Sequence, residues 1–293
     1  MTSKTDKLIF HSLASKCPLG TDIDVARKLG FDGLETSGPK IESYLSAGFT
    51  AHELRAKADG LMMPGIGFLI DLERQGDDRA IMLEEAHRLC ELAAVAGAKG
   101  IEVITGPLEL RAYEKGSEKL YPHIYRGLLD RSFSEQLTMT AENLRLVADM
   151  AADFGLIVYL EGLSWTPLKT IESQVRVLEL CDRSNTGLVI DFWHCYTAGQ
   201  TLDQVAALDS NLIYGVHVCD SLPFDGGVPD EKKLRNVSTG AGILPLDEWV
   251  DAVRATGFKG WWSCELFCER DHYDSVYDVA RNLKSMLENL IRK

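Results

Sequence analysis

Short apolar runs alternate with longer amphipathic stretches along the chain, and this alternation occurs eight times. The runs are rich in β-branched, aromatic and aliphatic residues, which is typical of fully buried parallel strands. The clearest amphipathic stretches are predicted helices over 78–97, 134–154 and 273–291. The predicted strands span 8–13, 33–38, 63–69, 100–106, 157–163, 187–192, 213–219 and 261–266.

Signals for helix ends fit the same alternation. Three pairs have the spacing of a capping box, namely Thr50 with Glu53, Ser132 with Glu135, and Thr201 with Gln204. Glycines stand where helices should end, just before the next apolar run, at Gly30, Gly97, Gly155 and Gly257. An order of helix, glycine and apolar run is typical of consecutive βαβ units.

Eight strands that alternate with helices, without a linker-like stretch, favour one (β/α)₈ TIM barrel of parallel strands over two domains. The length of 293 residues suffices, because such a barrel needs about 250. The long segments 107–133 and 220–245 follow strand ends and should lie over the mouth of the barrel. We therefore expect a single domain over residues 1–293 with its site at the C-terminal mouth.

Composition and charge indicate the expected location of the protein and the partners it is not expected to bind. No apolar run approaches the ~20 residues of a membrane span, and the N-terminus lacks the apolar region of a signal peptide, so a cytoplasmic location is expected. A formal net charge of −13 argues against nucleic acid or an anionic membrane as a partner. The seven cysteines show no metal-binding spacing and are interpreted as buried apolar residues.

Four consecutive apolar runs in the second half each end in a residue that can bind a divalent cation. These residues are Glu161, Asp191, His217 and Glu265. The last side chain of a barrel strand can point into the mouth, and neighbouring strands bring such side chains together. Three carboxylates and one imidazole suit a single divalent ion, Mn²⁺ first, with Mg²⁺, Co²⁺ and Zn²⁺ as alternatives. The competing interpretation is that each acidic residue caps a helix or pairs with a surface arginine.

From Glu161 onward the chain resembles the xylose isomerase-like TIM barrels, which include sugar isomerases and epimerases, inosose dehydratases and 3-dehydroshikimate dehydratases. In that family, residues at the ends of strands 5 to 8 hold one divalent metal, and the resemblance places this role on the four residues above. The family's Asp-x-x-His is matched by Asp191 and His194, and its Gly-x-Gly-x-x-Pro-Leu loop by GAGILPL at 240–246. The first half resembles the family by architecture only. The histidines in the first half of the chain lie mostly on predicted helices or loops. We therefore expect a site for one metal ion rather than a trinuclear site.

The resemblance implies an isomerase or epimerase that acts on a sugar or related polyhydroxylated carbonyl compound through a metal-stabilised enediolate. Glu161 and Glu265 would then be the catalytic pair that removes and returns the proton. If the enolate expels a β-hydroxyl instead, the site is that of a dehydratase of a cyclic keto-polyol or keto-acid, such as inosose or 3-dehydroshikimate. A third hypothesis is a non-catalytic carbohydrate-binding barrel. Exposed apolar faces on such barrels often support dimers or tetramers, so a homo-oligomer is a candidate assembly.

Three further residues are candidate substrate contacts. The resemblance implies that His194 donates a hydrogen bond to a substrate oxygen, and the alternative is a buried histidine satisfied by backbone. Arg235 is a candidate to hold an anionic or hydroxylated group, or else a solvated loop arginine. Trp165 is a candidate wall for a sugar face, or else it packs under its loop. Glu35, at the end of the second strand, is a weaker candidate for the mouth of the barrel, and the favoured interpretation is a loop carboxylate.

Two positions depart from the ketose 3-epimerases of this family. Those enzymes carry a glutamate six residues after the strand-5 ligand and an arginine six residues after the strand-7 histidine. Pro167 and Pro223 stand at these positions here, which speaks against a strict ketose 3-epimerase. The segments EGLSWTP, IDFWHCYTAG and HVCDS resemble dehydratase members more closely, while the choice among the reactions stays open.

Overall fold

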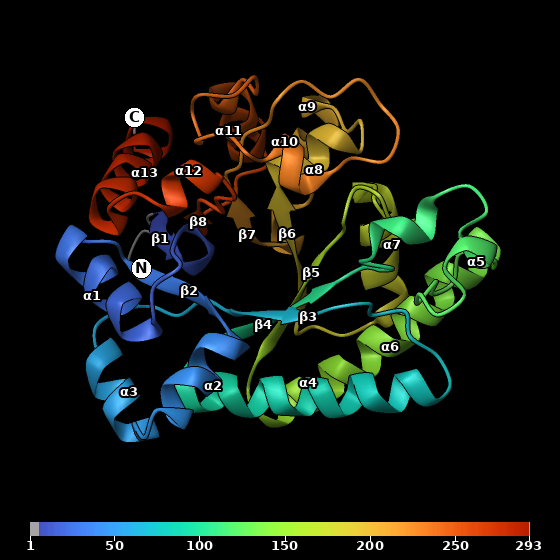
Figure 1. The fold of residues 1–293 in the computed structure, drawn as a ribbon, viewed down its shortest axis with the longest axis horizontal. Helices are drawn as coiled ribbons and strands as arrows, with labels where there is room; N and C mark the ends of the chain where they lie inside the picture. The colour runs from blue at the N-terminus through green and yellow to red at the C-terminus, as the bar shows by residue number, and fades with distance from the viewer. Residues whose placement is uncertain (1–5, 293) are drawn as a thin grey trace.

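The computed structural model describes residues 6–292 and shows a closed barrel of eight parallel strands in chain order (Figure 1). The single (β/α)₈ TIM barrel expected from the sequence is confirmed, with β8 pairing to β1 to close the sheet. The strands are β1 Lys7–His11, β2 Gly33–Ser37, β3 Ile66–Leu69, β4 Gly100–Ile104, β5 Ile157–Glu161, β6 Thr186–Asp191, β7 Ile213–His217 and β8 Trp261–Ser263.

Helices follow the strands and surround the barrel (Figure 1). They are α1 Leu19–Leu29, α2 Gly38–Ser46, α3 Ala51–Ala58, α4 Asp77–Ala96, α5 Ser117–Leu120, α6 Phe133–Asp153, α7 Ile171–Cys181, α8 Phe192–Thr197, α9 Leu202–Ala206, α10 Glu231–Leu234, α11 Leu246–Ala255, α12 Glu269–His272 and α13 Val276–Ile291, with 3₁₀ turns η1 Ser12–Ala14, η2 Leu110–Tyr113 and η3 Ser210–Leu212. All three predicted capping boxes form, at the starts of α3, α6 and α9. Gly30 and Gly97 end α1 and α4 in the left-handed conformation, as predicted.

Most predicted strands extend too far at their carboxyl ends. The run predicted over 261–266 ends as a strand at Ser263, although Cys264 and Leu266 stay buried. An apolar run indicates that a segment is buried, but a strand and the buried loop that continues it have the same pattern. Glu265 therefore lies two residues beyond β8 rather than at its end. The helix predicted over 273–291 also differs at one end. It begins at Val276, after the short helix α12.

Two layers of side chains fill the barrel interior. The lower layer is apolar and consists of Ile9, Tyr159, Val189 and Trp261. Each of these residues stands two positions before a polar residue on the same strand, so the two share the inner face. The polar partners are His11, Glu161, Asp191 and Ser263. The apolar layer thus forms a packed floor beneath a polar layer at the carboxyl end of the barrel.

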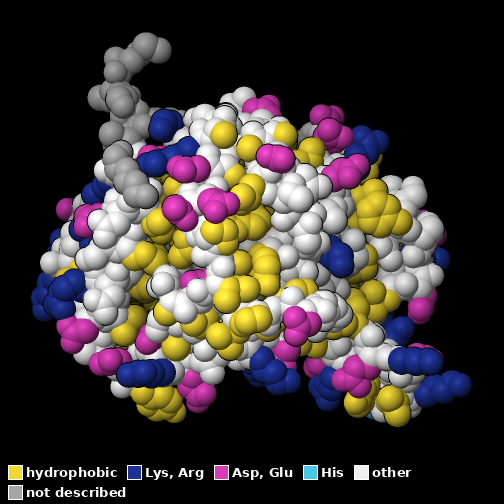
Figure 2. All heavy atoms as spheres, turned by 90° about the horizontal axis from the view of Figure 1, so that it is seen from above, with side chains coloured by type: hydrophobic (Ala, Val, Ile, Leu, Met, Phe, Trp, Pro, Cys, Tyr) yellow, Lys and Arg dark blue, Asp and Glu magenta, His cyan; other side chains and the backbone are white. Residues whose placement is uncertain are grey.

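The surface carries both signs of charge. In the view of Figure 2, lysine and arginine side chains lie scattered among acidic ones, and hydrophobic side chains gather towards the middle of this face. None of the helices within residues 6–292 is long and apolar enough to cross a bilayer.

Candidate metal centre

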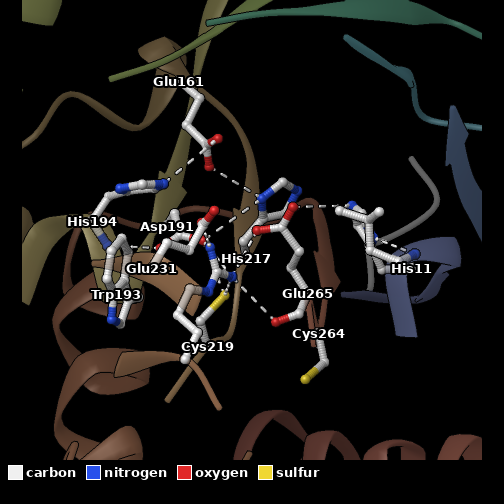
Figure 3. Close-up of polar contacts among 12 residues, drawn as sticks. His11, Glu161, Asp191, Trp193, His194, His217, Cys219, Glu231, Cys264 and Glu265 are labelled. Atoms are coloured by element: carbon white, nitrogen blue, oxygen red, sulfur yellow. Dashed lines mark hydrogen bonds and ion pairs between the residues drawn. The ribbon is translucent and has the colours of Figure 1, made fainter. Parts of the chain in front are cut away.

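The four candidate ligands converge at the mouth of the barrel (Figure 3). Glu161, Asp191 and His217 are the last residues of β5, β6 and β7, and Glu265 follows β8. Each offers a ligand atom, and these atoms all lie within 4.8 Å of one another. All four side chains are buried. Adjacent strands therefore bring together residues that are far apart in the sequence.

Two buried polar atoms of this cluster lack a hydrogen-bond partner among the described residues. His217 Nδ1 lies 3.4 Å from Glu161 Oε1 and 4.0 Å from Asp191 Oδ2. Both His217 Nδ1 and Glu161 Oε1 are buried, and neither forms a hydrogen bond within the described part of the chain. Leaving buried polar atoms unpaired costs about 1–3 kcal/mol each. A shared divalent cation would satisfy both atoms, and three carboxylates with one imidazole are a donor set that suits it.

Glu35 determines how the His217 ring is oriented. Its Oε2 lies 3.1 Å from His217 Nε2 and accepts from Ser263 Oγ at 3.0 Å, while its Oε1 accepts from Tyr159 Oη at 2.9 Å. A carboxylate on one ring nitrogen leaves the other nitrogen, Nδ1, facing the cluster. The interpretation of Glu35 as a loop carboxylate is therefore wrong, because it lies within β2 and is 1% exposed. Alternation along the run 33–38 was the signal that places it on the inner face.

The protonation preferences of the cluster follow from burial and neighbouring charge. Burial, together with the charges of Glu265 and Asp191, raises the pKa of Glu161 to about 8. Burial disfavours charge on Asp191, but Arg235, His194 and His217 together outweigh it, and the pKa of Asp191 lies at about 2. The pKa of His217 is raised, because its acidic neighbours, Glu35 foremost, outweigh the effect of burial. Glu161 therefore binds a proton far more tightly than the neighbouring Asp191.

Asp191 and His194 form the predicted Asp-x-x-His arrangement. Asp191 Oδ1 caps α8 by accepting from the His194 backbone N–H at 2.8 Å, while Oδ2 faces the cluster and accepts from Cys219 Sγ at 3.0 Å. His194 Nδ1 accepts from the Ser164 backbone N–H at 3.2 Å, so the ring proton lies on Nε2. Nε2 lies 4.0 Å from Glu161 Oε2. Burial lowers the pKa of His194 to about 4, so the ring is a neutral donor at the edge of the site.

Arg235 lies inside the site rather than in solvent, so the alternative of a solvated loop arginine is wrong. It is 2% exposed, and its Nη2 donates to Glu265 Oε2 at 2.7 Å and lies 3.4 Å from Asp191 Oδ2. Nη1 donates to Glu231 Oε1 at 2.9 Å, and the guanidinium lies 4.2 Å from the Phe267 ring centroid. Arg235 directly follows α10, and the guanidinium also lies 5.4 Å from the ring centroid of Trp193 in α8.

Trp165 lies next to His194, with ring centroids 5.6 Å apart. Its Nε1 donates to Pro107 O at 3.3 Å, and its ring packs with Trp193 and the small apolar cluster of Ile104, Leu163 and Cys219. Packing beneath the loop is therefore observed, on the side of the site where His194 presents its Nε2–H.

Sequence reasoning missed one further acid of the barrel interior. Glu102 of β4 is buried, its Oε1 has no partner among residues 6–292, and burial together with the charge of Glu161 raises its pKa. It lies in the middle of an apolar run, so only its position on the inner face of β4, in register with Tyr159, could have identified it.

Comparison with known proteins gives one family and several relatives. Residues 23–290 match the model of the xylose isomerase-like TIM barrel family. Inosose isomerase of Bacillus velezensis is 27% identical over 157 residues, which are 53% of this chain and 55% of that protein. 3-Dehydroshikimate dehydratase of Pseudomonas aeruginosa is 27% identical over 130 residues, which are 44% of this chain and 20% of that protein. The match therefore spans about half the length of the first of these relatives, and less of the second.

Among solved structures, the IolI protein with a bound zinc atom is similar, with a TM-score of 0.83 at 19% identity, covering 97% of this chain and 98% of that one. At this identity the likeness concerns the fold.

Proposed function

The chain belongs to the xylose isomerase-like TIM barrel family, and from that premise we propose that it is a divalent-metal-dependent isomerase or epimerase of a polyhydroxylated carbonyl compound. The observation that carries the proposal is the buried cluster of Glu161, Asp191, His217 and Glu265, with two atoms that lack a partner among the described residues. The relatives named as an isomerase and a dehydratase of such compounds support the substrate class.

The four residues of the cluster would hold one ion. Mn²⁺ and Zn²⁺ are the first two to test, the former for the oxygen-rich donor set and the latter because the similar IolI protein binds zinc. When bound, a divalent cation supplies Lewis-acid stabilisation of the negative charge that develops on the substrate oxygens during enolisation.

The acid/base work falls to the two glutamates. Glu161 comes from β5 and Glu265 follows β8, so the two carboxylates approach the cluster from different sides (Figure 3). One carboxylate removes the proton α to the carbonyl, and the other returns a proton to the opposite face or to the neighbouring carbon. Return to the opposite face is epimerisation, and return to the neighbouring carbon is isomerisation. His194 donates its Nε2–H to a substrate oxygen, and Arg235 holds Glu265 and Asp191 in place.

A dehydratase is the second candidate. The relation to a 3-dehydroshikimate dehydratase supports it, and so do Pro167 and Pro223 at the positions where ketose 3-epimerases carry a glutamate and an arginine. The enolate would then expel a β-hydroxyl, with a protonated carboxyl group as the acid for the leaving group.

Metal analysis tests the premise that both candidates share. We expect one ion per chain in the parent and at least tenfold weaker binding in Glu161→Gln and Glu265→Gln. Glu73→Gln is the matched control, because Glu73 is also a buried glutamate but lies outside the cluster. If the two cluster variants bind as much Mn²⁺ and Zn²⁺ as the parent, the assignment of the site is wrong.

A substrate panel then separates the reactions. Keto-sugars, inososes and 3-dehydroshikimate are incubated with the metal-loaded protein in D₂O. Deuterium incorporation at the α-carbon without a new ultraviolet chromophore identifies an isomerase or epimerase. Loss of water with a conjugated, ultraviolet-absorbing product identifies a dehydratase. Binding without either change identifies a non-catalytic carbohydrate-binding barrel and overturns the proposal.

A further inference from the structure

Two histidines direct the same ring nitrogen towards the cluster from opposite sides (Figure 3). His194 does so beside Glu161, as described above. His11, the last residue of β1, does so beside Glu265. The Leu13 backbone N–H donates to His11 Nδ1 at 3.2 Å, so the proton of a neutral His11 ring also lies on Nε2.

Both Nε2–H groups are free donors. Neither His11 Nε2 nor His194 Nε2 forms a hydrogen bond with any residue in the described range 6–292, although the side chains are only 5% and 4% exposed. His11 Nε2 lies 4.0 Å from Glu265 Oε1 and 3.6 Å from Glu35 Oε2. These distances are too long for hydrogen bonds. Neither nitrogen is among the fully buried atoms that lack a partner, so each donor is accessible to an acceptor oxygen of a bound ligand.

We propose that His11 is a second substrate-binding residue, which donates its Nε2–H to a hydroxyl or carbonyl oxygen of the substrate on the Glu265 side. The inference rests on the proposed function and specifies its substrate. With His194 on the Glu161 side, the two donors bracket the reacting carbons, so the substrate carries an oxygen on each side of the pair that reacts. A neutral N–H group suits a hydroxyl better than a carboxylate, which favours an uncharged keto-polyol over a keto-acid at this position.

The competing explanation for His11 is a second metal ion. Ligand atoms of His11, Glu35 and His217 also lie within 4.8 Å of one another. The hydrogen bonds oppose this explanation, because His11 Nε2 carries a proton when Nδ1 accepts from Leu13. The Nε2 of His217 is likewise already engaged by Glu35. A single ion at Nδ1 of His217 is compatible with both contacts.

Two substitutions of His11 separate a donor from a packing residue. His11→Phe keeps the ring and removes the donor, whereas His11→Gln places an amide N–H near the position of Nε2. On the best substrate of the panel we expect His11→Phe to lower kcat/KM about 100-fold, and His11→Gln to stay within about tenfold of the parent. Metal content and thermal midpoint are measured on both variants, and we expect them to match the parent.

Binding of an unreactive probe gives a readout that does not depend on turnover. myo-Inositol and its monodeoxy analogues are titrated into the Mn²⁺-loaded parent and His11→Phe. We expect at least tenfold weaker binding of myo-inositol by the variant, and equal binding by both proteins of the analogue that lacks the hydroxyl facing His11. Long-range ¹H–¹⁵N correlation of the parent should report the Nε2–H form of His11.

The outcomes are distinguishable. A parent that binds metal and turns over substrate, with an unaffected His11→Phe variant, overturns the role of His11 alone. Two ions per chain in the parent and one in His11→Phe assign His11 to a second metal site and overturn it as well. A parent that binds neither a divalent ion nor any polyol overturns the proposed function, and the role of His11 with it.

Discussion

Glu35 contacts His217 through its Oε2, which lies 3.1 Å from His217 Nε2. We predict that Glu35→Gln weakens Mn²⁺ and Zn²⁺ binding about 10–100-fold, because a neutral amide holds the imidazole less firmly and lowers its basicity. Competition with a chelating indicator measures the affinity. Tyr159→Phe is the control, since it removes one donor to Glu35 and leaves the contact with His217. Unchanged affinity in Glu35→Gln would show that His217 is oriented by other groups.

Glu73 makes stability depend on pH. It is 4% exposed, and burial raises its pKa to about 7. The folded state therefore holds a proton that the unfolded state releases above about pH 4.3, so stability is lost as the pH rises from there to about 7. We expect the free energy of unfolding of the parent to fall by about 2–3 kcal/mol more than that of Glu73→Gln between pH 4.5 and 8. Denaturant unfolding at both pH values tests this, with Glu84→Gln on the exposed face of α4 as control.

At the scale of elements, the GAGILPL segment is a loop built around one carboxylate. Asp220 accepts backbone N–H groups from Gly240 and Gly242 through Oδ2, and from Leu244 through Oδ1. A Cβ at Gly242 would come within 2.2 Å of Asp220 Oδ1, which explains the glycine at this position.

We predict that Asp220→Ala lowers the free energy of unfolding by about 2–4 kcal/mol, because it leaves these backbone donors without their charged acceptor. Thr50→Ala, which removes the cap of the exposed helix α3, should cost only about 1 kcal/mol. Denaturant unfolding compares the two variants. An equal loss in the free energy of unfolding of both variants would mean that water replaces Asp220 as the acceptor for these backbone N–H groups.

At the scale of the whole molecule, the candidate ligands tie β5, β6 and β7 to the segment after β8. An ion that binds only the folded barrel at a concentration of 100 Kd adds about 2.7 kcal/mol to its stability. We therefore expect Mn²⁺ or Zn²⁺ to raise the thermal midpoint by roughly 5 °C over protein treated with EDTA. Asp191→Asn should abolish this difference. A midpoint that is the same with metal and with EDTA would contradict a site formed by folding.

The sequence by itself determined the barrel, the order of its elements, and the positions of Glu161, Asp191 and His217 at the ends of three strands. It could do so because burial on both faces of a parallel strand produces a continuous apolar run that is visible in one segment. A residue that can bind a metal at the end of such a run can be recognised within the same segment.

The tertiary structure alone decided what surrounds those residues. Glu35 and His217 lie 182 positions apart in the sequence, and His11 and Glu265 come from opposite ends of the chain. Arg235 is a loop residue by every local signal, yet it lies buried against Glu265 and Asp191. Local pattern does not determine these contacts, because they arise from closing β8 against β1 and folding the loop after β7 over the mouth. The structure thus surrounds the four candidate ligands with a carboxylate that orients His217, an arginine that pairs with Asp191 and Glu265, and two histidines.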